Sequence, residues 1–268
     1  MIRRFDLAGL VIAAALVFFI LLPVLTVFIW AFAEQWFYPS LLPTKWGLRF
    51  WSKVLERPDV WSAFWTSMKI TTLVTGLSAL ICLPAAYAFA RMEFPGRQAF
   101  MMSFLMATAF PRFAITISLA VLFLVFNLVG TVTGVVIVQL LTTLLLMIWL
   151  PTAAFRGVSR NMEEAARDVG AGPLRVFWSI TLPQALPSIA AAVLMTFVWT
   201  FYETEGAWLV GAPRITTMPI LMMQMINNQM VVQYGAVLSV LLWVPSLAAL
   251  LLARRVLGSD TFAKGLGA

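Results

Sequence analysis

Long, uninterrupted apolar runs are the feature that most restricts what this chain can fold into. Six such runs lie at 7–33, 62–90, 100–127, 131–154, 184–210 and 232–253. A helix of about 20 residues spans the ~30 Å hydrocarbon core of a bilayer. The runs do not alternate between polar and apolar residues, as the strands of a membrane barrel would. We therefore predict an all-α integral membrane protein with six transmembrane helices.

The first run has the basic start of a signal peptide, because Arg3 and Arg4 precede it. It is longer than the ~7–15 residues of a signal core, and Ala33 leads into Glu-Gln-Trp-Phe-Tyr instead of a small-residue cleavage site. We interpret it as a retained span.

The distribution of basic residues predicts the orientation. Six spans place both termini on one side, with these residues: Arg3, Arg4, Arg91, Arg97, Arg156, Arg160, Arg167, Arg175, Arg254, Arg255 and Lys264. The other side has fewer: Lys45, Arg49, Lys53, Arg57 and Arg214. Lys and Arg accumulate on the cytoplasmic side of membrane proteins, so we expect both termini to be cytoplasmic. The net charge of +7 therefore reports orientation and not nucleic-acid binding.

Several kinds of chemistry are excluded by composition. The chain has no histidine and a single cysteine, Cys82. Histidine-based zinc sites, Ser-His catalysis and internal disulfides are therefore absent. The few acidic residues are not grouped as catalytic pairs or metal ligands. We expect no catalytic residue, no metal site and no cofactor in this chain, and we interpret Cys82 as a small buried residue.

A polar segment, 156–183, separates the fourth and fifth runs. Glu163 to Val169 predicts a helix, with acids in its first turn and Asn161 as the N-cap. Gly170 is suited to the left-handed end of that helix, and Pro173 to the start of the next. Such an elbow suits docking into a groove of another protein, although a structured loop without a partner explains the composition equally well.

The same segment carries a family motif. Glu164-Ala165-Ala166, three residues, Gly170, nine residues, Ile180, one residue and Leu182-Pro183 match the EAA loop of ABC importer permeases at every position. Segments 83–91 and 213–219 also fit the layout of that family. Over roughly 62–254, the chain resembles a type I permease subunit, closest to the polyamine, opine and 2-aminoalkylphosphonate group.

The resemblance implies a division of the chain and a set of partners. Residues 1–61 would form the first span and outer loop, 62–254 the transmembrane core with the elbow (156–183), and 255–268 a cytoplasmic tail. The partners would be two copies of a cytoplasmic ABC ATPase, a second, non-identical permease, an extracytoplasmic binding protein and the lipid of a bacterial inner membrane. None of the four lysines lies in the Gly-Lys-Ser/Thr of a phosphate-binding loop, so ATP and Mg²⁺ would be held by the ATPase. The implied ATPase-coupling residues are Glu163, Glu164, Ala165, Ala166, Asp168, Gly170, Ala171, Ile180, Leu182 and Pro183.

Ionisable residues inside the spans mark a candidate substrate path, because such groups usually face the protein interior or a water-filled cavity. Lys69 and either Glu203 or Glu205 could form a pair toward the outer side. On a regular helix the two acids lie about 200° apart, so only one would face the path. With Trp199 and Tyr202 they would attract an ammonium group, and Gln139 is a further polar candidate. A structural ion pair within an aromatic belt is the alternative. Arg112 follows Pro111, a predicted kink, and either lines the cavity or pairs internally.

These observations predict a permease subunit of an ATP-driven importer for a polyamine or another amine-bearing solute. The same machinery importing a phosphonate, an opine or ferric iron remains an alternative. A secondary transporter is a further alternative, but it leaves the elbow unexplained.

Overall fold

The computed structural model describes residues 7–229 and 231–257, which form two compact units. The first unit comprises Met1–Ser62 and Leu221–Val244, and the second comprises Ala63–Ile220 and Pro245–Ala268. Arg3, Arg4, Lys264 and most of the predicted tail lie outside the described residues.

The first unit begins with the apolar helix α1 (Leu7–Phe32) and continues into a short hairpin. Its remaining elements are β1 (Ala33–Gln35), β2 (Lys45–Trp46), α2 (Arg49–Leu55), the start of α3 (Pro58–Arg91), most of α10 (Met218–Gln229) and the first part of α11 (Val232–Leu257). The side chains of residues 9–23 of α1 are exposed, which suits a helix that faces lipid. The antiparallel hairpin is held by an ion pair between Glu34 Oε2 and Lys45 Nζ, 2.8 Å apart.

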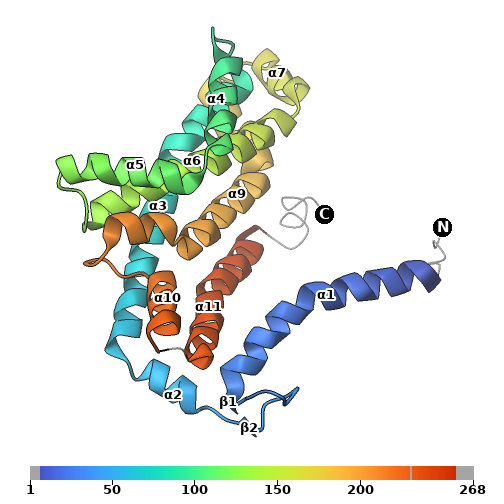
Figure 1. The fold of residues 1–268 in the computed structure, drawn as a ribbon. Helices are drawn as coiled ribbons and strands as arrows, with labels where there is room; N and C mark the ends of the chain where they lie inside the picture. Colours follow the sequence, from blue (N-terminus) through green and yellow to red (C-terminus); the bar gives the residue numbers. More distant parts are fainter. Residues whose placement is uncertain (1–6, 230, 258–268) are drawn as a thin grey trace. The chain divides into compact units, whose positions relative to one another are not determined.

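The second unit is built around α6 (Val132–Gly157) packed along α9 (Leu182–Tyr202), with α3 beside them (Figure 1). It also contains α4 (Arg97–Ala109), α5 (Arg112–Val125), α7 (Arg160–Asp168), α8 (Pro173–Val176) and the π-helical segments η1 (Phe177–Thr181) and η2 (Ala207–Gly211). Near one end of α9, Ala86 and Ala185 pack with Phe155. Small residues of this kind let helices approach closely within a membrane. Cys82 is fully buried, as expected.

Five helices are long and apolar enough to cross a membrane by length and composition. They are Gly9–Phe32, Pro58–Arg91, Val132–Gly157, Pro173–Tyr202 and Val232–Arg255. A sixth crossing exists only if the bent pair α4 and α5 counts as one span. The all-α class is therefore confirmed, and the count of six depends on this pair.

The third run is not one straight helix, contrary to the prediction. Helices α4 and α5 meet at an angle of 97° around Phe110 and Pro111. Phe110 is extended (φ −83°, ψ 144°), because the ring of a following proline clashes with a helical backbone at the preceding residue. Pro111 also lacks the N–H that would continue the helix. The predicted kink at Pro111 is therefore a complete break.

The fifth run also differs from the prediction at both ends. It is helical from Pro173, so Pro183 does not separate the elbow from the span. The N–H of Leu182 donates to the carbonyl of Phe177, five residues earlier, and this wider π turn precedes Pro183. At the far end the helix stops at Tyr202, instead of continuing to Val210, and resumes after a two-residue break.

Candidate functional site

The elbow is a helix–turn–helix whose turn is set by Gly170. This residue has φ of +87°, in the left-handed region that glycine adopts readily. Its N–H donates to the carbonyl of Arg167 at 2.8 Å, and the N–H of Ala171 donates to the carbonyl of Ala166 at 3.0 Å. These two bonds form a Schellman motif, which confirms the predicted helix end. Pro173 is the first residue of α8, also as predicted.

The start of the elbow differs from the prediction. Helix α7 begins at Arg160, with Ser159 as its N-cap residue and no side-chain capping hydrogen bond. Asn161 therefore lies inside the helix, and its assignment as N-cap was wrong.

Glu163 is buried, so it does not contribute to an exposed docking surface as predicted. It is 5% exposed, and its Oε1 lies 3.0 Å from Arg91 Nη2 at the end of α3. The hydroxyl of Thr181 donates to the same oxygen at 2.6 Å, and Arg91 also donates to the carbonyl of Val158 at 2.9 Å. This Arg91–Glu163–Thr181 network joins α7 to α3 and to η1. The side chains of Arg91 and Glu163 are 10% and 6% exposed, and within the network the carboxylate of Glu163 compensates the charge of Arg91.

The other side of the elbow is exposed and partly apolar. Glu164, Ala165, Asp168 and Gly170 are exposed, whereas Ala166 and Ala171 are partly buried. Ile180 and Leu182 are partly buried and Pro183 is exposed where the elbow continues into α9. The large exposed apolar side chains are Met162, Val169, Leu174 and Trp178. Val169 and Leu174, on either side of the turn, are the most exposed of these, at 85% and 74%.

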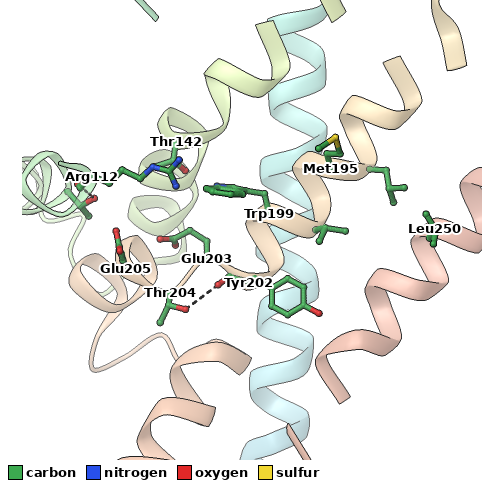
Figure 2. Close-up of a pocket in the computed structure, with 12 residues that line it drawn as sticks. Arg112, Thr142, Met195, Trp199, Tyr202, Glu203, Thr204, Glu205 and Leu250 are labelled. Carbon is green, nitrogen blue, oxygen red and sulfur yellow. Dashed lines mark hydrogen bonds between the residues drawn. The ribbon is translucent and has the colours of Figure 1, made fainter. Parts of the chain in front are cut away.

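A cavity of about 620 Å³ lies at the other end of α9 (Figure 2). Its lining combines aromatic, aliphatic, hydroxyl and charged side chains: Arg112, Thr116, Thr142, Leu194, Met195, Val198, Trp199, Tyr202, Glu203, Thr204, Glu205 and Leu250. An apolar pocket with a few polar groups is the usual form of a small-molecule site.

The break after Tyr202 brings both acids to this cavity. Glu203 Oε1 accepts from the N–H of Gly206 at 2.6 Å, and Oε2 accepts from the N–H of Ala207 at 3.2 Å. Gln139 Nε2, from α6, donates to Oε2 at 2.8 Å. Glu203 thus caps the next helical segment, where a negative charge is favoured. The helix is not regular here, so the condition behind the prediction of a single path-facing acid is not met, and both acids line the cavity.

Two other ionisable residues behave differently. The guanidinium of Arg112 lies 4.5 Å from the centroid of the Trp199 ring, in a cation–π contact within the cavity. Lys69 is exposed, does not line this cavity, and forms no ion pair within 7–229 and 231–257. The Lys69–Glu203 and Lys69–Glu205 pairs are therefore not formed.

Comparison with known proteins identifies the family. Residues 81–258, more than half of the chain, match the family described as binding-protein-dependent transport system inner membrane component. The chain belongs to this family. It is a permease component of ABC importers, and the family places it in the inner membrane.

The permease is similar to several named relatives. It is 31% identical over 176 residues to the molybdate/tungstate transport system permease of Thermococcus kodakarensis, covering 66% of this chain and 70% of that protein. It is 30% identical over 175 residues to a putative ABC transporter permease of Streptomyces antibioticus, covering 65% and 76%. It is 29% identical over 213 residues to the maltose/maltodextrin permease of Yersinia pestis, covering 75% and 69%.

Solved structures share the fold. A chain of a bacterial ABC transporter that imports alginate superposes with a TM-score of 0.69 at 18% identity, covering 95% of the permease and 98% of that chain. A chain of an inward-facing methionine ABC transporter gives a TM-score of 0.57 at 17% identity, covering 75% and 96%. The expected type I permease fold is thus confirmed.

Sequence reasoning missed the partners of the two ends of α9. Arg91 was counted for orientation and as the end of segment 83–91, but not as a partner of Glu163, and Thr181 was not considered. A buried arginine near the end of a span is a signal that a carboxylate must lie nearby, but the sequence does not say which one. Gln139 was proposed as a path residue, whereas here it is a buried partner of Glu203.

Proposed function

We propose that this permease couples ATP hydrolysis on a separate ATPase to import through the exposed side of its elbow. The elbow has an exposed Ala165 and a partly buried Ala166 on α7, and its apolar side chains Val169 and Leu174 are exposed. Such a surface fits a groove of a second protein. A loop that stays in water gains nothing from exposing apolar side chains. The exposed apolar side chains of a helix–turn–helix closed by a Schellman motif are the observation that carries the proposal.

The rest of the assembly follows from the same proposal. Both termini lie in the cytoplasm, two ATPase copies bind ATP and Mg²⁺, and one permease pairs with a second, non-identical permease to enclose the path. An extracytoplasmic binding protein delivers the solute. One neighbouring structure is of an alginate transporter in complex with a substrate-bound periplasmic protein, which supports this kind of assembly.

The test is to enlarge Ala165. Because this side chain is exposed, Ala165→Trp should leave the fold of the permease intact and hold the two surfaces apart. We expect the purified complex to lose the ATPase or to lose solute-stimulated ATP hydrolysis, while Ala165→Ser retains both. Full retention of the ATPase and of coupled transport by Ala165→Trp would refute the docking surface.

We further propose that the cavity around Glu205 admits a solute with a positively charged amine. Glu205 is exposed in the cavity and forms no ion pair among the described residues. Tyr202 lines the same space, and rings with a carboxylate attract ammonium groups. The face of Trp199 is already covered by Arg112, so Glu205 and not Trp199 is the main attraction.

A second cargo class has its own supporting observation. Relatives of the permease are named for molybdate or tungstate and for sugars, and Arg112 offers this cavity a guanidinium that would suit an oxyanion. Uptake of the ligand carried by the binding protein separates the two classes. An amine cargo predicts that Glu205→Gln lowers uptake and Arg112→Gln does not, and an oxyanion predicts the reverse. Glu56→Gln, in an exposed position outside the cavity, is the control.

A further inference from the structure

Four arginines gather around two adjoining cavities at the end of the second unit where the elbow begins. The cavities have volumes of about 600 and 410 Å³ and share Arg97 and Arg156. Arg91 and Arg160 line the smaller one, and Trp149 lines the larger one. Helices α3, α4, α6 and α7 all contribute, so the cluster depends on the fold and not on one stretch of basic sequence.

The positive charge of this cluster is not balanced within the described chain. Arg97 donates to the carbonyl of Met92 at 3.2 Å, and Arg156 donates to the carbonyl of Phe89 at 3.3 Å. Arg156 also reaches Met101 Sδ at 3.4 Å. These acceptors are uncharged, and neither arginine forms an ion pair with a described residue.

Two acidic residues lie near the cluster, but they do not neutralise its positive charge. Glu163 is already committed to Arg91, which leaves Arg97, Arg156 and Arg160 without a carboxylate partner. Glu93 lines the larger cavity, but it is exposed and forms no ion pair with a described residue. One exposed carboxylate cannot neutralise three guanidinium groups.

Two buried hydrogen-bond donors near the cluster lack an acceptor among the described residues, which also indicates a missing anion. The side chain of Arg91 is 10% exposed, and its Nε has no hydrogen-bond partner in the described part of the chain. The indole Nε1 of Trp149 is likewise buried without an acceptor. An unsatisfied buried donor costs about 1–3 kcal/mol, so such atoms mark places where an acceptor is missing.

The start of α4 adds backbone donors after Arg97, whose own N–H already donates to the carbonyl of Phe94 at 3.3 Å. Gly96 is the N-cap of this helix with φ of +81°, and Gly96, Gln98 and Ala99 line the larger cavity. The first N–H groups of a helix have no acceptor within it, and they favour an anion.

We propose that these cavities bind a phosphate group, carried either by an anionic phospholipid or by a small phosphorylated solute. Guanidinium groups approaching from different helices suit a group with several charged oxygens better than a single carboxylate. Exposed Met102, which lines the larger cavity, and exposed Phe100, whose ring lies near Gly96, supply an apolar surface for acyl chains. Basic pockets between membrane helices bind phospholipid headgroups in this manner.

The side of the membrane from which the phosphate reaches the cavities is the one part of this proposal that rests on the function proposed above. If the termini are cytoplasmic, the phosphate comes from the inner leaflet or the cytoplasm. Binding itself is measured without transport, so failure of either proposal can be recognised independently of the other.

The experiment uses the full chain purified in its complex and freed of lipid in mild detergent. Native mass spectrometry would follow the binding of phosphatidylglycerol, of phosphatidylcholine with the same acyl chains, and of glycerol phosphate. We expect retention of phosphatidylglycerol, weakened roughly tenfold in Arg97→Gln, as for the loss of one hydrogen bond to a charged group. Arg160→Gln serves as a second variant, since Arg160 is exposed and makes no hydrogen bond with a described residue. Arg175→Gln removes an exposed arginine outside both cavities and should bind normally.

Each outcome decides the proposal. Selective binding of phosphatidylglycerol that falls in Arg97→Gln and Arg160→Gln supports a lipid, and the same pattern with glycerol phosphate alone supports a soluble ligand. Equal binding of both lipids, or equal binding by all variants, overturns the site. If no phosphate compound binds but Arg97→Gln releases the ATPase, the arginines contact an acidic protein surface and the proposal is also overturned.

Discussion

The two ends of α9 are each held by a glutamate, but the two carboxylates have different partners. At the elbow, Glu163 is buried and accepts from a cation, Arg91, and from Thr181. At the opposite end, Glu203 is partly exposed and accepts from two backbone N–H groups and from Gln139. The carboxylate of Glu163 balances a buried positive charge, and that of Glu203 accepts from N–H groups at the start of a helical segment.

This difference fits the different tasks that we propose for the two ends. A buried ion pair holds three segments in one arrangement, and losing one partner leaves the other uncompensated. A capping carboxylate beside a cavity can be reached by solvent and solute, so its loss costs less. The elbow end therefore suits transmission of force, and the broken end suits contact with a cargo.

The largest effect is expected for Glu163→Ala. Removing the carboxylate leaves Arg91 buried without a counter-charge, which should lower the free energy of unfolding by about 3–5 kcal/mol. Thermal unfolding of the purified complex would measure the change. Glu164→Ala removes the neighbouring, exposed carboxylate and should leave the unfolding temperature nearly unchanged. Equal losses in both variants would show that burial of Glu163 does not matter.

Glu203→Gln should have an intermediate effect. The amide keeps one oxygen acceptor but presents an NH₂ group to donors, so at least one of the bonds from Gly206, Ala207 or Gln139 is lost. We expect the free energy of unfolding to fall by about 1–2 kcal/mol. Glu205→Gln, whose carboxylate has no hydrogen-bond partner among the described residues, should keep the stability of the parent. Identical unfolding curves for the two variants would contradict the capping role.

The sequence predicted the parts of this comparison that depend on local chemistry. Gly170 and Pro173 bound the turn as expected, because a left-handed C-terminus and a proline start are local conformations. The break at Glu203 was missed because it depends on a side chain returning to N–H groups three and four residues ahead and on Gln139 from another helix. The pairing of Arg91 with Glu163, 72 residues apart, was missed because only folding brings them together.

Gly170→Ala tests whether the turn geometry of the elbow matters by itself. No described atom lies within 4 Å of a Cβ added here, so the cost comes only from φ of +87° and should be about 1 kcal/mol. Gly172→Ala is the matched control, because Gly172 has φ of −67° and equally open surroundings. We expect Gly170→Ala to lower the ratio of solute transported to ATP hydrolysed, and Gly172→Ala to preserve it. Equal ratios in both variants would mean that the elbow tolerates a relaxed turn.

The smallest effect is expected at the hairpin of the first unit, where the ion pair has an exposed cation, Lys45, and so serves as a reference for the Arg91–Glu163 pair. The hydrogen bond from Lys45 holds the pKa of Glu34 below its usual value of 4.5. A lowered pKa in the folded state means that the stabilisation is present above about pH 4.5 and is lost as the pH falls through the folded value. Unfolding measured from about pH 6 to about pH 3.5 should show a slightly steeper loss in the parent than in Lys45→Met. Because the Lys45 side chain is 61% exposed, water screens this pair, and the difference should be far smaller than that of Glu163→Ala. A comparable difference would mean that the exposure of the cation does not distinguish the two ion pairs.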